Sequence, residues 1–376
     1  MAKAPVSPAV PEQKIQRPPA EIQFAAELAA LAKADAGQPR PAGWLLTPRS
    51  VLAFIRGDAA LGTHAKFVGA PALVETCIVS LATARGLMLV GEPGTAKSWL
   101  SELLAAAICG DSTLTIQGSA GTTDDHIRYS WNYALLLAQG PSTASLVPAP
   151  MYRGMRDGTL VRFEEITRCP VEVQDTLLSL LSDRVLHVPE IPGDGRSLFA
   201  TTGFNIIATA NIRDRGVNEM SAALKRRFNF VTIPAIPDIR DELAVVRRES
   251  DHALAQAQIP ARLPEDLAEV LVTVFRELRQ AKTSDGQALE PMTTAMSTAE
   301  AVSVAVATVT RAWYFAEGQP KGAHLLQGLL GTAFKDVPED RGRLAHYLQL
   351  SSKKRQERTA VNQAWTDLVA AHATVA

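Results

Sequence analysis

The chain has 376 residues, 47% of them hydrophobic, and its 38 basic and 39 acidic residues leave a net charge of −1. That length allows two or three domains with sizeable cores. The balanced charge gives no general attraction to nucleic acid or to an anionic membrane surface, and no stretch is long and apolar enough to span a bilayer, so we expect neither partner.

The beginning of the chain is rich in proline and alanine. Residues 1–20 carry five prolines and no apolar core of a secretory signal, so we expect a disordered tail and a cytoplasmic location. Cys77, Cys109 and Cys169 lie far apart without metal-ligand spacing. We therefore expect buried thiols in a reducing compartment and no structural metal.

Helices are expected before the first strand. Residues 21–35 are rich in Ala and Leu and predict a helix, which the linker 37–43 follows. Thr47-Pro48 predicts a helix start, because a capping side chain precedes proline there. Another helix over 71–83 leads to the strand predicted over 87–90.

A glycine-rich loop links that strand to a helix predicted over 99–109. It reads Gly91-Glu92-Pro93-Gly94-Thr95-Ala96-Lys97-Ser98. Strand, loop, Lys-Ser and helix in this order suit a polyphosphate, because amides at the helix start donate to phosphate oxygens and Lys97 neutralises them. Ser98 is placed to ligate Mg²⁺. Ala96 stands where the strict pattern has Gly, and we expect it to adopt ordinary helical angles.

Strands and helices then alternate. The expected strands cover residues 114–117, 160–163, 204–210 and 228–233, and the main helices between them cover 170–182 and 219–226. Such alternation predicts an α/β domain whose parallel sheet is covered by helices on both faces.

After residue 234 the predicted elements are helices only. They cover residues 240–258, 264–281 and 297–316, followed by a charged helical tail. We therefore predict three parts: the tail and N-terminal helix (1–40), a nucleotide-binding core (41–235) and a helical region (236–376).

Two long segments interrupt the alternation. Residues 118–158 contain Trp131, Tyr133 and Tyr152, and residues 186–203 contain the prolines and glycines of a projecting hairpin. Long excursions from a compact core are uncommon unless they have a function, although surface decoration is the alternative.

Two carboxylates follow the strand predicted over 160–163. Hydrolysis of a triphosphate needs one carboxylate to hold Mg²⁺ and its water shell, and another to polarise the attacking water. We assign the metal role to Glu164 and the catalytic base to Glu165; solvated surface charge is the alternative. Arg162 interrupts the apolar run of this strand.

Two later motifs fit the same chemistry. The strand over 204–210 ends at Asn211, whose neutral amide can lie between the γ-phosphate and the water, or can simply form a turn. A helix ends in Lys225-Arg226-Arg227. These cations either interact with the helix C-terminus or supply an arginine to a neighbouring subunit's nucleotide, an effect worth roughly 10³–10⁵ in rate.

This order of motifs resembles the AAA+ ATPases, specifically the MoxR type within the dynein-related group. The closest segments are Gly91-Glu92-Pro93-Gly94-Thr95, Glu165-Ile166-Thr167-Arg168 followed by Pro170, and Ala208-Thr209-Ala210-Asn211. The resemblance covers residues 60–235 and more weakly the helical remainder. It implies a P-loop αβα core with a parallel sheet, an all-helical lid, and a homo-oligomeric, usually hexameric, ring with ATP at each interface.

The resemblance also implies roles for single residues. Residues 91–98 bind ATP, Ser98 and Glu164 hold Mg²⁺, Glu165 is the catalytic base, Asn211 is sensor 1, and Arg227 is the arginine finger with Arg226 as runner-up. Val68 and Gly69, which follow Phe67, line the adenine pocket by their position. The chain departs from the family in having Glu164 in place of Asp, and in lacking the sensor-2 Arg in Ser297-Thr298-Ala299-Glu300-Ala301.

The expected activity is hydrolysis of ATP to ADP and phosphate by a chaperone-like remodelling ATPase. The resemblance implies a protein partner with a von Willebrand factor A (VWA) domain, and ring insertions that face the pore or that partner. The alternatives are a nucleic-acid motor like the McrB GTPases, a metal-chelatase motor subunit, and a slow ATP-gated switch or scaffold.

Overall fold

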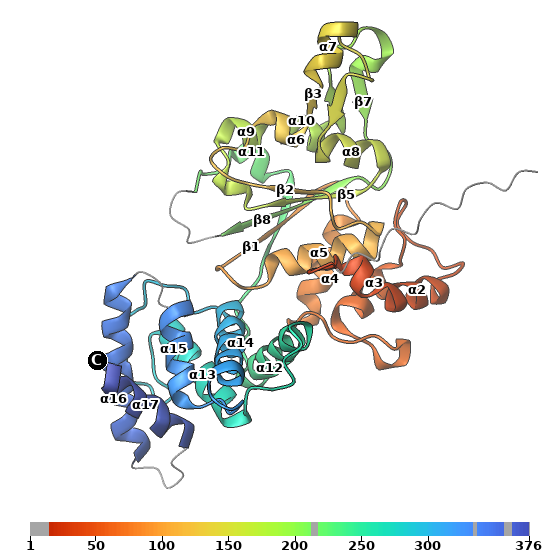
Figure 1. The fold of residues 1–376 in the computed structure, drawn as a ribbon. Coiled ribbons are helices and arrows are strands. Elements are labelled where there is room, and N and C mark those ends of the chain that lie inside the picture. The colour runs from red at the N-terminus through yellow and green to blue at the C-terminus, as the bar shows by residue number, and fades with distance from the viewer. Residues whose placement is uncertain (1–14, 212–216, 334–336, 357–362, 376) are drawn as a thin grey trace, which may run out of the picture.

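The structure is a computed structural model that describes residues 15–211, 217–333, 337–356 and 363–375 (Figure 1). Most of the predicted disordered tail, residues 1–14, lies outside these ranges. Across the described residues, no helix has both the length and the apolar character needed to cross a lipid bilayer.

Within the described residues, five parallel strands form the central sheet in the order β2-β5-β8-β1-β9. They are β1 (Gly86–Gly91), β2 (Thr115–Gln117), β5 (Leu160–Glu164), β8 (Asn205–Asn211) and β9 (Phe228–Thr232). The predicted parallel sheet is confirmed. Strand side chains alternate between faces, so Leu87 and Leu89 join one apolar core while Met88 joins the other.

Helices cover both faces of this sheet. One core includes residues of α3 (Pro48–Arg56), α4 (Pro71–Leu81) and α5 (Lys97–Cys109). The opposite core includes residues of α8 (Pro150–Asp157), α10 (Leu177–Ser182) and α11 (Ala222–Lys225). The predicted start of α3 is confirmed, since the Thr47 hydroxyl accepts a hydrogen bond from the Ser50 backbone amide at 3.2 Å.

Two predicted helices are each divided in two. The helix expected over 21–35 consists of α1 (Ala20–Gln23) and α2 (Ala25–Ala34), which meet at Phe24. The helix expected over 170–182 consists of α9 (Val171–Asp175) and α10, which meet at Thr176.

The two long segments form one projection beside the sheet (Figure 1). The first contains α6 (Asp124–Ile127), β3 (Tyr129–Trp131), α7 (Tyr133–Gln139), β4 (Leu146–Pro148) and α8, so it is far more structured than a loop. In the second, β6 (Val185–His187) and β7 (Ser197–Phe199) pair as the predicted hairpin. The Tyr129 hydroxyl donates to the Glu190 carboxylate at 3.0 Å, which ties the segments together.

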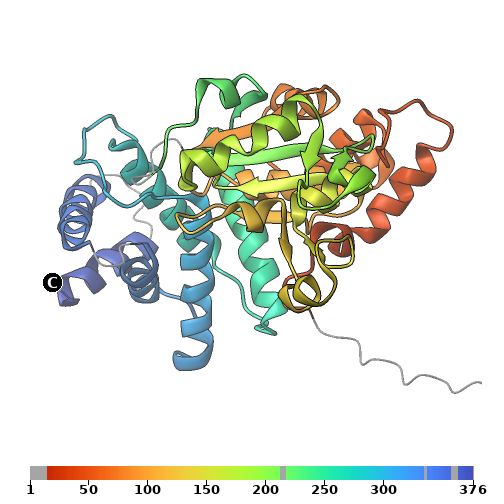
Figure 2. The same ribbon diagram turned by 90° about the horizontal axis from the view of Figure 1, so that it is seen from above.

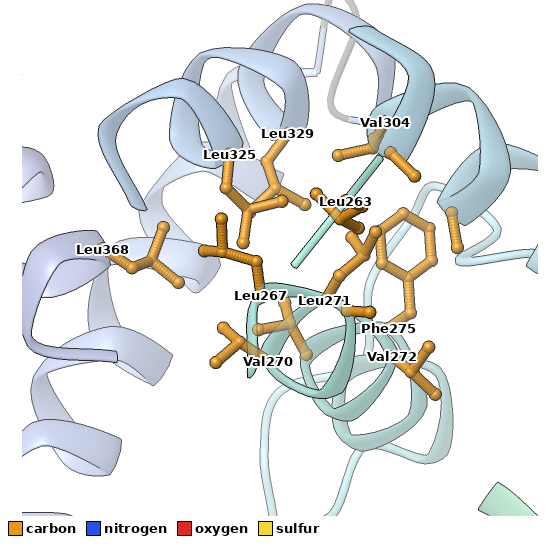
Figure 3. Close-up of a cluster of buried hydrophobic side chains, with 14 of the residues drawn as sticks. Leu263, Leu267, Val270, Leu271, Val272, Phe275, Val304, Leu325, Leu329 and Leu368 are labelled. Atoms are coloured by element: carbon orange, nitrogen blue, oxygen red, sulfur yellow. The ribbon is translucent and has the colours of Figure 1, made fainter. Parts of the chain in front are cut away.

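Residues after β9 form helices around a core of their own. They are α12 (Ile239–Gln256), α13 (Glu265–Gln280), α14 (Thr298–Phe315), α15 (Gly322–Gly328), α16 (Pro338–Gln356) and α17 (Gln363–Val375), with a π-helical turn at Leu329–Ala333. Side chains such as Leu271, Phe275 and Leu325 fill this core (Figure 3). In Figure 2 the blue helices near the C-terminus and the red N-terminal helices lie on opposite sides of the sheet. The exact domain limits stay a prediction.

Candidate active site

The glycine-rich loop lies between the carboxyl end of the central strand β1 and the start of α5. Lys97 is the first residue of α5 and is buried. Its ammonium donates to the backbone oxygen of Glu92 at 2.7 Å and of Gly91 at 3.2 Å, so the charge lies inside the loop. A helix N-terminus and a lysine here present amide donors and positive charge to an anion.

The prediction that Ala96 has helical angles is wrong. Ala96 is the N-cap of α5 and takes the left-handed conformation, with φ 63° and ψ 27°. A cap residue lies outside the helix and must turn the chain into it, which is why its angles are not helical. Glycine adopts this conformation freely, whereas an L-residue is disfavoured by about 1–2 kcal/mol. Ala96 therefore leaves some strain in the loop.

Glu164 at the end of β5 lies against the first turn of α5. In the described part of the chain, four side chains donate to its carboxylate: Ser98 at 2.6 Å, Ser101 at 2.6 Å, Thr209 at 2.8 Å and Arg162 at 2.9 Å. Burial alone would raise the pKa of Glu164, but the hydrogen bonds from Ser101 and Ser98 and the charge of Arg162 outweigh it and lower the pKa. The carboxylate is therefore ionised and held beside Ser98.

Sequence reasoning missed Arg162, Ser101 and Thr209 as parts of this site. Arg162 is buried and also donates to the Ser101 hydroxyl at 2.9 Å and to the Ser98 backbone oxygen at 2.9 Å. A signal was present, because residues two apart on a strand share a face and residues three apart on a helix do too. Arg162 with Glu164, and Ser98 with Ser101, have these spacings.

Glu165 is engaged differently from Glu164. It has φ 54°, its backbone amide donates to the Thr209 hydroxyl at 2.9 Å, and one of its carboxylate oxygens lies 2.5 Å from Nε of Arg168. Both partners of this ion pair are partly exposed. A guanidinium on one oxygen competes with water for the carboxylate, so release from Arg168 would free both oxygens of Glu165 to accept a proton from water.

Asn211 ends β8 beside the loop. The parallel register places Asn211 directly opposite Gly91, the first residue of the loop. The structure thus brings Lys97, Ser98, Glu164 and Asn211 to the carboxyl edge of the sheet, where ligands bind in open α/β sheets.

The predicted arginine fingers lie at the opposite edge. The backbone oxygen of Arg227 accepts from the Gly86 amide at 2.9 Å, at the start of β1, which is roughly 16 Å long at 3.3 Å per residue. Nε of Arg227 donates to the Ser182 hydroxyl at 2.8 Å, while Arg226 is exposed. Both arginines are therefore remote from the loop of their own chain.

The start of α14 touches the loop. A Cβ built on Gly94 would lie 2.2 Å from Cβ of Ser297, the residue that caps α14 together with Glu300. This is where the resemblance expects a sensor-2 arginine, and α14 begins instead with Thr298-Ala299-Glu300. Arg279 approaches this point by donating to the Met296 backbone oxygen at 2.9 Å, but it also pairs with buried Glu242 at 2.8 Å.

Val68 and Gly69 lie in the segment before α4 and are half-buried. The indole nitrogen of Trp99, the residue after Ser98, donates to the backbone oxygen of Lys66 at 3.0 Å. This bond ties the segment to the phosphate-loop helix, and the adenine-lining role of Val68 and Gly69 stays a prediction.

The residues present fit Mg²⁺ bound together with a nucleotide. Mg²⁺ takes oxygen ligands, usually one or two carboxylates plus phosphate oxygens and water. The adjacent Ser98 hydroxyl and Glu164 carboxylate are such ligands. Among the residues that the structure describes, no group of three or more His, Cys, Asp or Glu could hold a metal without a substrate.

Two family models match long parts of this chain. Residues 86–228 match the AAA domain (dynein-related subfamily), and residues 240–375 match the YehL-like AAA+ ATPase C-terminal domain. YehL of Escherichia coli (strain K12) is 55% identical over 338 residues, which cover 89% of this chain and 92% of YehL. YojN of Bacillus subtilis (strain 168) is 25% identical over 47% of this chain and 56% of its own length.

Among solved structures, NtrX from Brucella abortus in complex with ATP aligns with a TM-score of 0.46 and 13% identity. The alignment covers 77% of this chain and 63% of the NtrX chain.

Proposed function

We propose that this chain, which belongs to the family of YehL-like AAA+ ATPases, binds ATP with Mg²⁺ and hydrolyses it to ADP and phosphate to remodel a protein partner. The observation that carries the proposal is the contact between Glu164 and Ser98 beside Lys97, with Asn211 opposite Gly91. A carboxylate, a glycine-rich loop with its lysine and a neutral amide thus lie on one edge of the sheet, and this supports the proposed roles of Glu164, Lys97 and Asn211.

In the proposed reaction, Lys97 and the loop amides bind the phosphates, and Mg²⁺, when bound, would neutralise charge on them. Ser98 and Glu164 would hold the metal. Glu165 takes a proton from the attacking water after leaving Arg168, and Asn211 orients that water. The cytoplasm, where ATP and Mg²⁺ are abundant, is the proposed site of action.

Glu165→Gln tests the catalytic assignment. It keeps the shape of the side chain and removes the base, so ATP binding should persist while hydrolysis falls by roughly 10²–10⁴-fold. Glu172→Gln, at an exposed position of α9, is the matched control and should leave both unchanged. Hydrolysis by Glu165→Gln at the wild-type rate would remove Glu165 from the mechanism.

We also propose a homo-oligomeric ring, with a hexamer as the expected size, in which Arg227 or Arg226 reaches the nucleotide of the neighbouring subunit. The distance between these arginines and the loop of their own chain supports action between subunits. Mixing inactive Arg227→Ala with inactive Glu165→Gln should restore hydrolysis, because some interfaces then combine an intact base with an intact arginine. A mixture as inactive as its components would contradict the role of Arg227.

The proposed protein partner contains a VWA domain. Support for a VWA-domain protein comes from the resemblance to the MoxR type. Capture of such a protein by ATP-loaded Glu165→Gln, and not by Lys97→Ala, is the test.

A slow ATP-gated switch is the second candidate function. The ion pair between Glu165 and Arg168 and the lack of an arginine at the start of α14 favour it. A wild type that binds ATP and assembles with it, but turns ATP over no faster than Lys97→Ala, would support this candidate over an active remodelling enzyme.

A further inference from the structure

The N-terminal helices α1 and α2 pack closely against the core beside the phosphate-loop helix. The Ala20 amide donates to the carboxylate of Glu102 on α5 at 3.2 Å. The ring of Phe24 meets the rings of Phe54 and Trp99 edge-on, at centroid distances of 5.8 Å and 6.2 Å. Trp99 directly follows Ser98, so this layer touches the helix that carries the phosphate-binding residues.

A buried lysine joins this layer to the core. Nζ of Lys66 lies 2.6 Å from the Glu27 carboxylate on α2, and 4.7 Å and 4.3 Å from the ring centres of Phe24 and Phe54. It also donates to the Phe54 backbone oxygen at 2.9 Å. Burial lowers the pKa of Lys66, while Glu27 acts in the opposite direction. Burying an ammonium is costly unless its partners are well placed, so removing one should disturb this segment.

The segment that contains Lys66 is held from three sides. Its backbone is fixed to α3, since the Lys66 amide donates to the Ile55 oxygen at 2.9 Å. The indole of Trp99 on α5 donates to the Lys66 oxygen. From the helical region, Arg248 on α12 donates to the Ala65 oxygen at 3.1 Å, and Figure 1 shows α12 beside this orange segment. N-terminal helices, phosphate-loop helix and lid therefore meet here.

We propose that Lys66 and Glu27 are positioning residues for the adenosine side of the nucleotide site, so that the N-terminal helices set the affinity for ATP. The proposal rests on the proposed function and on the location of Val68 and Gly69, two and three residues after Lys66. The contacts of Lys66 with Glu27, Phe24 and Phe54 hold the backbone that leads into Val68 and Gly69. The phosphate loop has its own contacts through Lys97 and Glu164, so the two sides of the nucleotide can be perturbed separately.

The test compares ATP with inorganic tripolyphosphate, which lacks the adenosine. In Lys66→Met and in Glu27→Gln, we expect the Kd for ATP and ADP to rise by about tenfold, equivalent to about 1.4 kcal/mol, with the Kd for tripolyphosphate unchanged. His64→Ala is the matched control, since exposed His64 faces the same carboxylate at 3.5 Å and should leave both constants unchanged. Isothermal titration calorimetry on the full chain with Mg²⁺ measures them.

Several results would overturn the proposal. A parallel rise of both constants would mean that the N-terminal helices only stabilise the fold, and an unchanged Kd for ATP in folded Glu27→Gln would exclude positioning. Glu27→Gln keeps the shape of the side chain and so decides the matter if Lys66→Met does not fold. Lys97→Ala separates this failure from failure of the proposed function, because it should abolish binding of ATP and tripolyphosphate alike.

Discussion

The pair of Arg162 and Glu164 allows a quantitative test of the site. Glu164→Gln keeps the size of the side chain but removes the charge that neutralises Arg162. The side chains of Arg162 and Glu164 are 9% and 6% exposed, so water cannot replace the lost partner. Removing one member of a buried pair typically costs about 3–5 kcal/mol, and we expect a loss of stability in that range.

Replacing Arg162 should lower the stability less than replacing Glu164. In Arg162→Met, Glu164 keeps the hydroxyl donors of Ser98, Ser101 and Thr209, so we expect a loss of about 2–3 kcal/mol. The double variant buries no charge at this point. Its loss should therefore be smaller than the sum of the single losses by about 1–3 kcal/mol.

Equilibrium urea unfolding of the wild type and the three variants, followed by circular dichroism, measures this coupling. The stability losses of substitutions at independent sites add within about 0.5 kcal/mol. If the losses add within that margin, Arg162 and Glu164 do not act as a pair, and the geometry on which the metal assignment depends is incorrect.

Three further predictions concern the same loop and its neighbours. The pKa of Glu164 is lower in the folded protein than its ordinary value of 4.5. The contribution of the Glu164 carboxylate to stability should therefore be complete above pH 4.5 and be lost as the pH falls through the folded pKa. Below that pH, the urea midpoints of wild type and Glu164→Gln should converge. Arg168→Gln should raise the rate of ATP hydrolysis by up to about fivefold with KM unchanged, because the partly exposed ion pair of Arg168 with Glu165 is worth at most about 1 kcal/mol. A slower variant would show that Arg168 aligns Glu165 instead. The stability of Ala96→Gly should stay within about 1 kcal/mol of the wild type, because relief of strain in the folded loop is opposed by the greater entropy of the unfolded chain. In thermal unfolding, Ala96→Val should be less stable than the wild type by more than about 1 kcal/mol. Equal thermal stability of the two Ala96 variants would refute the left-handed conformation.

The sequence by itself determined the parts of the site that depend on neighbouring residues. Residues 91–98 follow one another along the chain, and the apolar runs that end at Glu164 and Asn211 predict strands whose carboxyl ends share an edge. Local periodicity and turn chemistry suffice for such elements, because their hydrogen bonds and side-chain directions repeat every few residues.

Only the tertiary structure decided which polar groups meet at the site and around it. Ser98 and Glu164 are separated by 66 positions and Lys66 and Glu27 by 39, and no local pattern says that these side chains meet. The pairing of Arg162 and the contact between Gly94 and Ser297 also depend on how whole helices and strands pack. A buried charge is tolerated only where several distant donors or acceptors converge on it, so its environment is a property of the complete fold.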